Sequence, residues 1–229
     1  APNGLKVGQE IASGAGAFNL DTKEVTYSQN LFKKLYPAST TKILTAYIII
    51  RNCNLSDTVI VSNNAVNPGA SSSICGLKEG DVITIEQLLY GLMLESGNDA
   101  AIALAEYCSG SVEAFSDEMN AYLAEIGATR THFVNPHGLT DPNHYTTVYD
   151  LYLICNEAVK YDKFIEIIHT PSYNSVYHDR NGKDKEFSLS TTNAYLKNEA
   201  FAPDNVTVIG GKTGTTSAAG SCLILYSRD

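Results

Sequence analysis

The sequence predicts a mixed α/β (α+β) domain, in which helices flank an antiparallel sheet and a helical segment is inserted between the two halves of that sheet. Three observations indicate this fold class. Strand-like alternation occurs near both ends, helical patterns fill the middle, and no repeat or long linker divides the 229 residues. We therefore expect one domain over residues 1–229, with an all-helical subdomain at about 55–165 between sheet halves at 1–54 and 166–229.

The N-terminal part reads as a hairpin followed by a helix. Two alternating segments, Gly14 to Leu20 and Val25 to Gln29, flank the turn Asp21 to Glu24. An apolar helix is expected from about Thr40 to Arg51, because Pro and Ser at Pro37 to Ser39 favour a helix start. This helix carries the first segment with chemical potential.

The middle of the chain has four helical patterns. Thr84 and Gln87 have the spacing of a capping box, directly before a leucine-rich run. The other three helices are expected at Asp99 to Tyr107, Val112 to Ile126 and about Val148 to Tyr161. Gly127 is a stop signal for the second of these, which ends at Ile126.

Alternation returns in the last third. Segments Ser172 to Tyr177 and Lys185 to Leu189 face each other across Asn181-Gly182, which is a strong hairpin signal. Val206 to Ile209 and Ser221 to Tyr226 complete the strand-rich end around a Gly-Gly-Lys-Thr-Gly turn. The two ends of the chain thus supply the expected sheet.

Composition excludes several function classes. The formal charge is −9, which argues against a nucleic-acid partner. The apolar run Ile43 to Ile50 is far shorter than the roughly 20 residues of a bilayer-spanning helix. Five cysteines show no C-x-x-C spacing, so we expect apolar fillers rather than a zinc or dithiol site. The start at Ala1-Pro2-Asn3 fits a mature secreted protein or a trimmed chain.

Three short segments could carry chemistry. At Ser39 and Lys42, the i, i+3 spacing on a helix places a hydroxyl beside an amine, and a desolvated lysine can activate a serine nucleophile. Ser96 and Asn98, on a loop between helices, can relay a proton and hold an amide, although such residues are also ordinary turn formers. The third segment, Gly210 to Thr216, offers a fixed charge and a strand edge for an extended peptide.

Each segment alone has a plain structural reading: an N-cap serine with a surface lysine, a polar turn, and a glycine-rich strand. A phosphate-binding loop is excluded for the third, because residue 206 is Val206 rather than glycine and no helix follows. The joint occurrence of Ser-x-x-Lys, Ser-x-Asn and Lys-Thr-Gly in this order resembles the penicillin-recognising serine enzymes. More closely, the chain resembles low-molecular-weight penicillin-binding D-alanyl-D-alanine carboxypeptidases of the S11 peptidase type. The likeness extends through the segments 37–42, 71–74, 76–80, 96–101, 135–139 and 211–216.

This resemblance implies a β-lactamase/transpeptidase-like fold and a role for each site residue. Ser39 would form an acyl-enzyme with the penultimate D-Ala, and Lys42 would take its proton, with Lys212 disfavouring the ammonium form. Ser96 would protonate the leaving D-Ala. The remaining residues would bind substrate: Asn98 would hold its amide or orient Lys42. Lys212, Thr213 and Thr215 would bind the terminal carboxylate, with Gly214 in the same strand. The backbone N–H groups of Ser39 and Thr215 would form the oxyanion hole.

The implied partners are peptidoglycan stem peptides ending in D-Ala-D-Ala and β-lactam antibiotics, with an extracytoplasmic location and no nucleic acid, metal or cofactor. His132, His137 and His144 lie close in sequence but lack a helical i, i+4 pair, so we expect no metal there. The family's domain normally continues past Asp229 with a strand, a helix and a further basic residue, so we expect a truncated C-terminal end. Membrane attachment is not visible in this chain.

Two alternatives remain open at this point. A class A β-lactamase shares the three motifs and needs a glutamate between the second and third; Glu157 and Glu166 lie in that interval but outside the expected loop pattern. A non-catalytic β-lactam or muropeptide sensor would keep Ser39 and Lys42 and never turn over.

Overall fold

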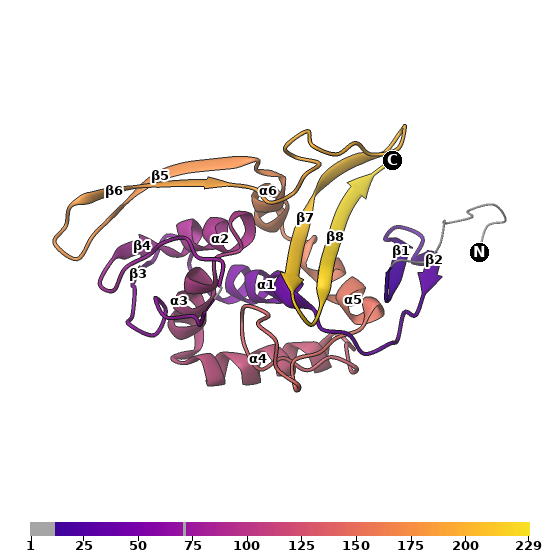
Figure 1. The fold of residues 1–229 in the computed structure, drawn as a ribbon, viewed down its shortest axis with the longest axis horizontal. Helices are drawn as coiled ribbons and strands as arrows, with labels where there is room; N and C mark the ends of the chain where they lie inside the picture. Colours follow the sequence, from indigo (N-terminus) through magenta and orange to yellow (C-terminus); the bar gives the residue numbers. More distant parts are fainter. Residues whose placement is uncertain (1–11, 71) are drawn as a thin grey trace.

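The computed structural model describes residues 12–70 and 72–229, which form the mixed helix-and-strand architecture drawn in Figure 1. The elements are, in order, β1 (Ala15–Asn19), β2 (Glu24–Gln29), the 3₁₀ helix η1 (Ala38–Thr41), α1 (Lys42–Asn52), β3 (Thr58–Ile60), β4 (Val82–Thr84), α2 (Ile85–Leu94), α3 (Asn98–Ser109), α4 (Val112–Glu125), α5 (Val148–Ala158), α6 (Asp162–His169), β5 (Ser172–His178), β6 (Asp184–Ser190), β7 (Thr207–Thr216) and β8 (Gly220–Arg228).

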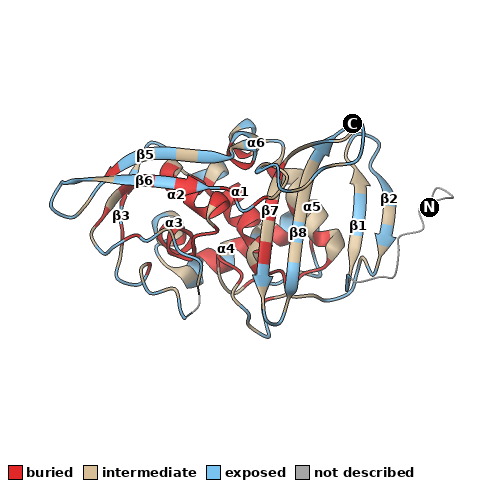
Figure 2. Ribbon diagram, turned by 45° about the horizontal axis from the view of Figure 1, so that its top comes forward, coloured by how far each residue is buried: buried red, intermediate tan, exposed pale blue. Residues whose placement is uncertain are grey.

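Helix α1 is the centre of the molecule. Helices α2, α3, α4, α5 and α6 all pack against it, and Figure 2 shows the buried residues concentrated there. Its side chains from Ile43 to Ile49 are almost completely buried. Burial of this much apolar surface is the main favourable contribution to folding, so α1 provides a rigid base for the residues at its N-terminal end.

Helix starts and turns follow the local sequence. The capping box forms as predicted, with Thr84 Oγ1 accepting from Gln87 N and Gln87 Oε1 accepting from Thr84 N. The predicted hairpins β1–β2 and β5–β6 are present. Gly127 has a φ of +80°, which supports its predicted role in ending α4.

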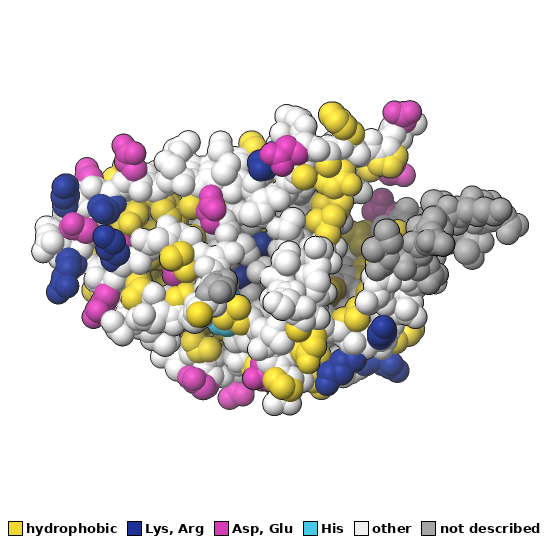
Figure 3. Space-filling view, in the orientation of Figure 1, with side chains coloured by type: hydrophobic (Ala, Val, Ile, Leu, Met, Phe, Trp, Pro, Cys, Tyr) yellow, Lys and Arg dark blue, Asp and Glu magenta, His cyan; other side chains and the backbone are white. Residues whose placement is uncertain are grey.

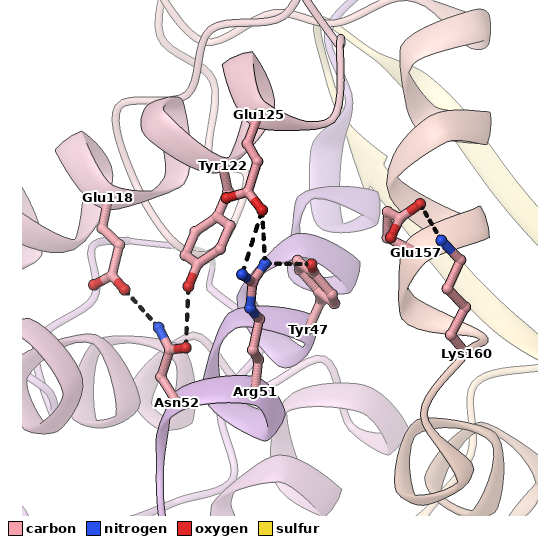
Figure 4. A network of polar contacts seen from close by, with 8 residues as sticks. All are labelled: Tyr47, Arg51, Asn52, Glu118, Tyr122, Glu125, Glu157 and Lys160. Atoms are coloured by element: carbon pink, nitrogen blue, oxygen red, sulfur yellow. Dashed lines mark hydrogen bonds and ion pairs between the residues drawn. The ribbon is translucent and has the colours of Figure 1, made fainter.

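The end of α1 is tied to α4 by a surface network (Figure 4). Arg51 Nη1 donates to Tyr47 Oη at 2.9 Å and to Glu125 Oε1 at 3.3 Å. Asn52 Nδ2 donates to Glu118 Oε1 at 2.7 Å. Since the Arg51 and Glu125 side chains are 35% and 57% exposed, this ion pair contributes little to stability.

The strand arrangement differs from the single sheet expected from the sequence. Among the described residues the strands form three separate sheets: β1–β2, β3-β4-β5-β6 and β7–β8. Val82 pairs with His178, which joins the β5–β6 hairpin to the middle of the chain rather than to its ends. The inserted segment at about 55–165 is therefore not all helical, because it contains β3 and β4.

Two further differences are local. The helix predicted from Val148 to Tyr161 ends at Ala158. A further helix, α6, follows it, and the helical spacing of its buried residues Phe164, Ile167 and Ile168 was not used in the prediction. The Gly-Gly-Lys-Thr-Gly segment lies within β7 and not at a turn, since the chain turns after Thr216. No described helix has the length and apolar character needed to cross a membrane.

Candidate active site

Ser39 lies on the 3₁₀ turn η1, directly before the buried helix α1. The preceding residue, Ala38, is completely buried and has a φ of +48°, a left-handed conformation that non-glycine residues rarely adopt. Lys42 is one helical turn further on, and its Nζ lies 3.1 Å from Ser39 Oγ. The predicted Ser-x-x-Lys pair is therefore a direct contact.

Lys42 is fully buried and contacts three oxygen atoms. Besides Ser39 Oγ, its Nζ lies 2.7 Å from Asn98 Oδ1 and 2.8 Å from the backbone oxygen of His137. The latter two oxygens can only accept hydrogen bonds, and a neutral amine has two N–H groups and one lone pair. The two N–H groups therefore match the two obligate acceptors, and the lone pair is left for the hydroxyl hydrogen of Ser39.

The surroundings favour this neutral form. Burial lowers the pKa of Lys42 well below its usual value, and the charge of Lys212 lowers it further. Asp99 acts in the opposite direction. Burial of the site outweighs that attraction, so Lys42 is placed to accept a proton. If it becomes protonated, all three N–H groups still have an acceptor.

Lys212 is the second buried lysine of the site and comes from β7. Its Nζ donates to Ser96 Oγ at 3.0 Å and to the backbone oxygen of Thr213 at 2.9 Å. Burial lowers the pKa of Lys212 to about 7. Ser96 has a φ of +60°, another left-handed non-glycine residue, in the short loop between α2 and α3.

Asn98 links Lys42 to the loop that follows Gly69. Its Nδ2 donates to Ser72 Oγ at 3.1 Å, and its backbone N–H donates to Ser73 O at 2.8 Å. The side-chain amide thus bridges the hydroxyl of Ser72 and the amine of Lys42.

Asp99 holds the same loop through hydrogen bonds to its backbone. Its carboxylate is 1% exposed and accepts the backbone N–H groups of Cys75, Gly76 and Leu77 at 2.9 to 3.2 Å. Together with the N–H of Ala100 at 2.9 Å, four N–H donors satisfy a buried carboxylate that has no ion-pair partner at hydrogen-bond distance among the described residues. The loop is therefore fixed by α3, the helix that also carries Asn98.

Strand β7 forms the opposite wall. Gly214 allows it to approach the nucleophile, because a Cβ on Gly214 would lie 2.8 Å from Ser39 N. Thr213 Oγ1 is hydrogen-bonded to Thr192 Oγ1 at 2.6 Å, and Thr216 Oγ1 accepts from Thr140 Oγ1 at 3.1 Å. The β7 side chains are thus held by the segments on either side.

A hollow of about 40 Å³ lies between these walls. Figure 3 shows basic atoms at the bottom of a recess in the middle of the face, between α3 and β7. Most other basic and acidic side chains visible in this view lie toward the outline of the molecule. The hollow is lined by Ser39, Ser72, Ser73, Asn98, His137, Gly138, Leu139, Thr215 and Thr216.

The structure brings the predicted residues together from three segments of the chain. Ser39, Asn98 and Thr215 line the hollow. Lys42 contacts two of these residues, Ser39 and Asn98, and Lys212 contacts Ser96. Thr213 and Gly214 lie beside them on β7. Sequence reasoning missed the His137 carbonyl as a partner of Lys42 and Ser72 as a partner of Asn98, although the segments containing them were part of the family resemblance.

Other candidates lie elsewhere. Glu157 is on α5 beside Lys160, and Glu166 is on α6, bonded to Tyr90 Oη and Lys163. Neither glutamate lines the hollow. Within residues 12–70 and 72–229, no three His, Cys, Asp or Glu side chains come close enough to hold a metal ion.

The chain matches a family model described as D-alanyl-D-alanine carboxypeptidase, Peptidase S11, over residues 7–228. The chain belongs to this family. It is 36% identical over 224 residues to the D-alanyl-D-alanine carboxypeptidase DacF of Bacillus subtilis, covering 95% of this chain and 54% of that protein. With DacC of Escherichia coli it shares 35% identity over 204 residues, covering 85% of this chain and 48% of that protein.

The structural match in the S11 family is equally extensive. The crystal structure of the Streptomyces K15 DD-transpeptidase superposes with a TM-score of 0.86 at 30% identity, covering 93% of this chain and 84% of that one. This confirms the predicted fold class. The chain spans about half the length of the curated relatives DacF and DacC.

Proposed function

We propose that this S11-family chain is a serine DD-carboxypeptidase, which removes the terminal D-Ala from peptidoglycan stem peptides through an acyl-enzyme on Ser39. β-Lactams would acylate the same oxygen. The observation that carries the proposal is the hydrogen-bond pattern of Lys42: two obligate acceptors take its N–H groups and leave the lone pair for Ser39. Because the substrate is cell-wall peptide, we propose an extracytoplasmic location.

Acylation follows from this geometry. Lys42 takes the hydroxyl proton of Ser39 while Oγ attacks the carbonyl carbon of the penultimate D-Ala. The backbone N–H groups of Ser39 and Thr215 are proposed to bind the oxyanion, a contribution typically worth about 3 kcal/mol per donor. Support comes from the hollow that both residues line and from Gly214, which lets β7 approach Ser39 N.

Departure of the leaving group uses the second lysine. The proton that Lys42 takes from Ser39 is proposed to pass through Ser96 Oγ, which accepts from Lys212 Nζ, to the nitrogen of the departing D-Ala as the C–N bond breaks. The ammonium of Lys212, with Thr213 and Thr215, would bind the terminal carboxylate. Since burial holds the pKa of free Lys212 near 7, an arriving carboxylate would favour its charged form. Water then releases the shortened peptide.

The proposal is tested by release of D-Ala from an acylated tripeptide ending in D-Ala-D-Ala. The parent chain should release D-Ala and Ser39→Ala should not, while Ser28→Ala, on the exposed strand β2, serves as the matched control. A peptide with a C-terminal amide should be a poor substrate because it lacks the charge that Lys212 binds. D-Ala release by Ser39→Ala at the parental rate would refute the proposal.

A second candidate differs only in the acceptor. The similarity to a DD-transpeptidase structure favours transfer of the acyl group to an amine. Adding a peptide with an N-terminal glycine, whose free amino group can accept the acyl group, separates the two activities in the same assay. Transfer yields a longer peptide, whereas hydrolysis yields a free carboxylate. Rapid penicillin hydrolysis would support a β-lactamase instead, and a permanent adduct without D-Ala release would support a sensor.

A further inference from the structure

The left-handed turn at Ala38 places Ser39 against Lys42, and its carbonyl group is held from two sides. Thr41 Oγ1 donates to Ala38 O at 2.9 Å. Gly138 packs against the same carbonyl so closely that a Cβ on it would lie 1.8 Å from Ala38 O. The turn is buried, so its strained conformation persists only through such contacts.

The hydroxyl of Thr41 has a partner of its own. His144, from the loop between α4 and α5, places Nε2 at 2.8 Å from Thr41 Oγ1. The other ring nitrogen, Nδ1, accepts the backbone N–H of Val134 at 3.1 Å. A neutral imidazole that accepts at Nδ1 carries its proton on Nε2. The ring also stacks on Phe133 at 4.5 Å with an interplanar angle of 9°.

These contacts give the hydrogen bonds one direction. His144 Nε2–H donates to Thr41 Oγ1, and the Thr41 hydroxyl hydrogen is then available only for Ala38 O. A hydroxyl without the His144 donor could rotate and accept from another group or donate elsewhere. The orientation of the histidine is fixed by Val134 N–H and by the Phe133 ring. No substrate atom is needed to complete the chain of bonds.

We propose that His144 is a positioning residue for acylation, which acts through Thr41 to hold the Ala38 turn and thereby the distance between Ser39 Oγ and Lys42 Nζ. The inference rests on the proposed function, because it concerns the nucleophile of that reaction. His144 is 1% exposed and does not line the hollow, so its effect reaches Ser39 only through the protein. Loss of His144 would slow formation of the bond between Ser39 Oγ and the β-lactam and leave the prior binding of the β-lactam unaffected.

The test measures acylation by benzylpenicillin at a temperature well below the unfolding midpoint, separating the first-order acylation constant from the prior dissociation constant. Thr41→Val removes the hydroxyl with little change in shape, and Thr41→Ser restores it. His144→Phe retains the ring stack and removes both hydrogen bonds. We expect the acylation constant to fall about tenfold in Thr41→Val and His144→Phe with an unchanged dissociation constant, and Thr41→Ser to recover most of the parental rate.

The double variant distinguishes a shared path from two separate defects. If His144 acts through Thr41, combining Thr41→Val with His144→Phe should slow acylation no more than either change alone. Multiplied losses, or parental acylation constants in both single variants, would overturn the inference while leaving the proposed function intact. A parent chain that forms no adduct would overturn both. The ¹⁵N spectrum should also show His144 neutral with its proton on Nε2, and a protonated ring would contradict the proposed direction of donation.

Discussion

The buried amine of Lys42 makes the stability of the fold depend on pH in a way that one substitution should remove. Burial lowers the pKa of Lys42 well below its usual value. There is therefore a pH range in which the folded chain holds a neutral amine and the unfolded chain an ammonium group. The unfolded state binds more protons in that range, so the free energy of unfolding rises with pH, by about 1.4 kcal/mol per unit for each such lysine.

Lys212 adds a second contribution of the same sign, since burial lowers its pKa to about 7. Between about pH 8 and about pH 9.5, each neutral lysine adds about 2 kcal/mol, and the pair about 4 kcal/mol. Lys42→Met should keep only about half of this gain. Loss of the amine also leaves Asn98 Oδ1 and His137 O without their donor, which lowers stability at every pH but does not alter the slope.

Urea unfolding followed by circular dichroism at both pH values measures these differences. Lys33→Met, at an exposed position, is the control and should retain the full gain of the parent. Groups common to all three chains cancel in the comparison. Equal gains in the parent and in Lys42→Met would show that Lys42 has the same protonation state in the folded and unfolded chains, and would refute its assignment as a neutral base.

Three further outcomes are expected. Gly138→Ala should lower the midpoint of thermal unfolding by several degrees, because its φ is +92° and the added Cβ would overlap Ala38 O; an unchanged midpoint would contradict the close approach. Acid should destabilise the fold as pH falls from about 6.5 toward 3, because burial lowers the pKa of both His137 and His144 to about 3 and only the unfolded chain binds protons at these histidines in that range. The midpoint of thermal unfolding, measured across that pH range, should therefore fall with pH, and a midpoint independent of pH would contradict this expectation. Asp99→Asn should slow acylation by roughly tenfold, because an amide cannot accept the three N–H bonds of the 75–77 loop as the carboxylate does; stopped-flow acylation at the parental rate would exclude this role.

The candidate site could be predicted from the sequence because its side chains have chemistry that is recognisable in short motifs. Ser39, Lys42, Ser96 and Lys212 were predicted in this way, and the structure pairs Ser39 with Lys42 and Ser96 with Lys212. The third oxygen around Lys42 could not be predicted, because it belongs to the backbone of His137 and a carbonyl has no residue signature. Interactions of this kind depend on how a distant loop folds against α1.

The fold shows the same division between local and long-range information. Local signals predicted the capping box at Thr84 and the hairpins, since their determinants lie within a few residues. The distribution of strands among sheets depends on pairings such as Val82 with His178, which no local pattern specifies. Helix α6 was missed because it is only eight residues long and only three residues separate it from α5.

The central claim, that Ser39 is a nucleophile activated by Lys42, is tested most directly by intact-mass measurement after addition of benzylpenicillin. The account predicts a one-to-one adduct that peptide mapping assigns to Ser39, that is absent in Ser39→Ala, and that forms more slowly by orders of magnitude in Lys42→Met. An adduct of undiminished rate in Lys42→Met, or one located on any residue other than Ser39, would contradict it.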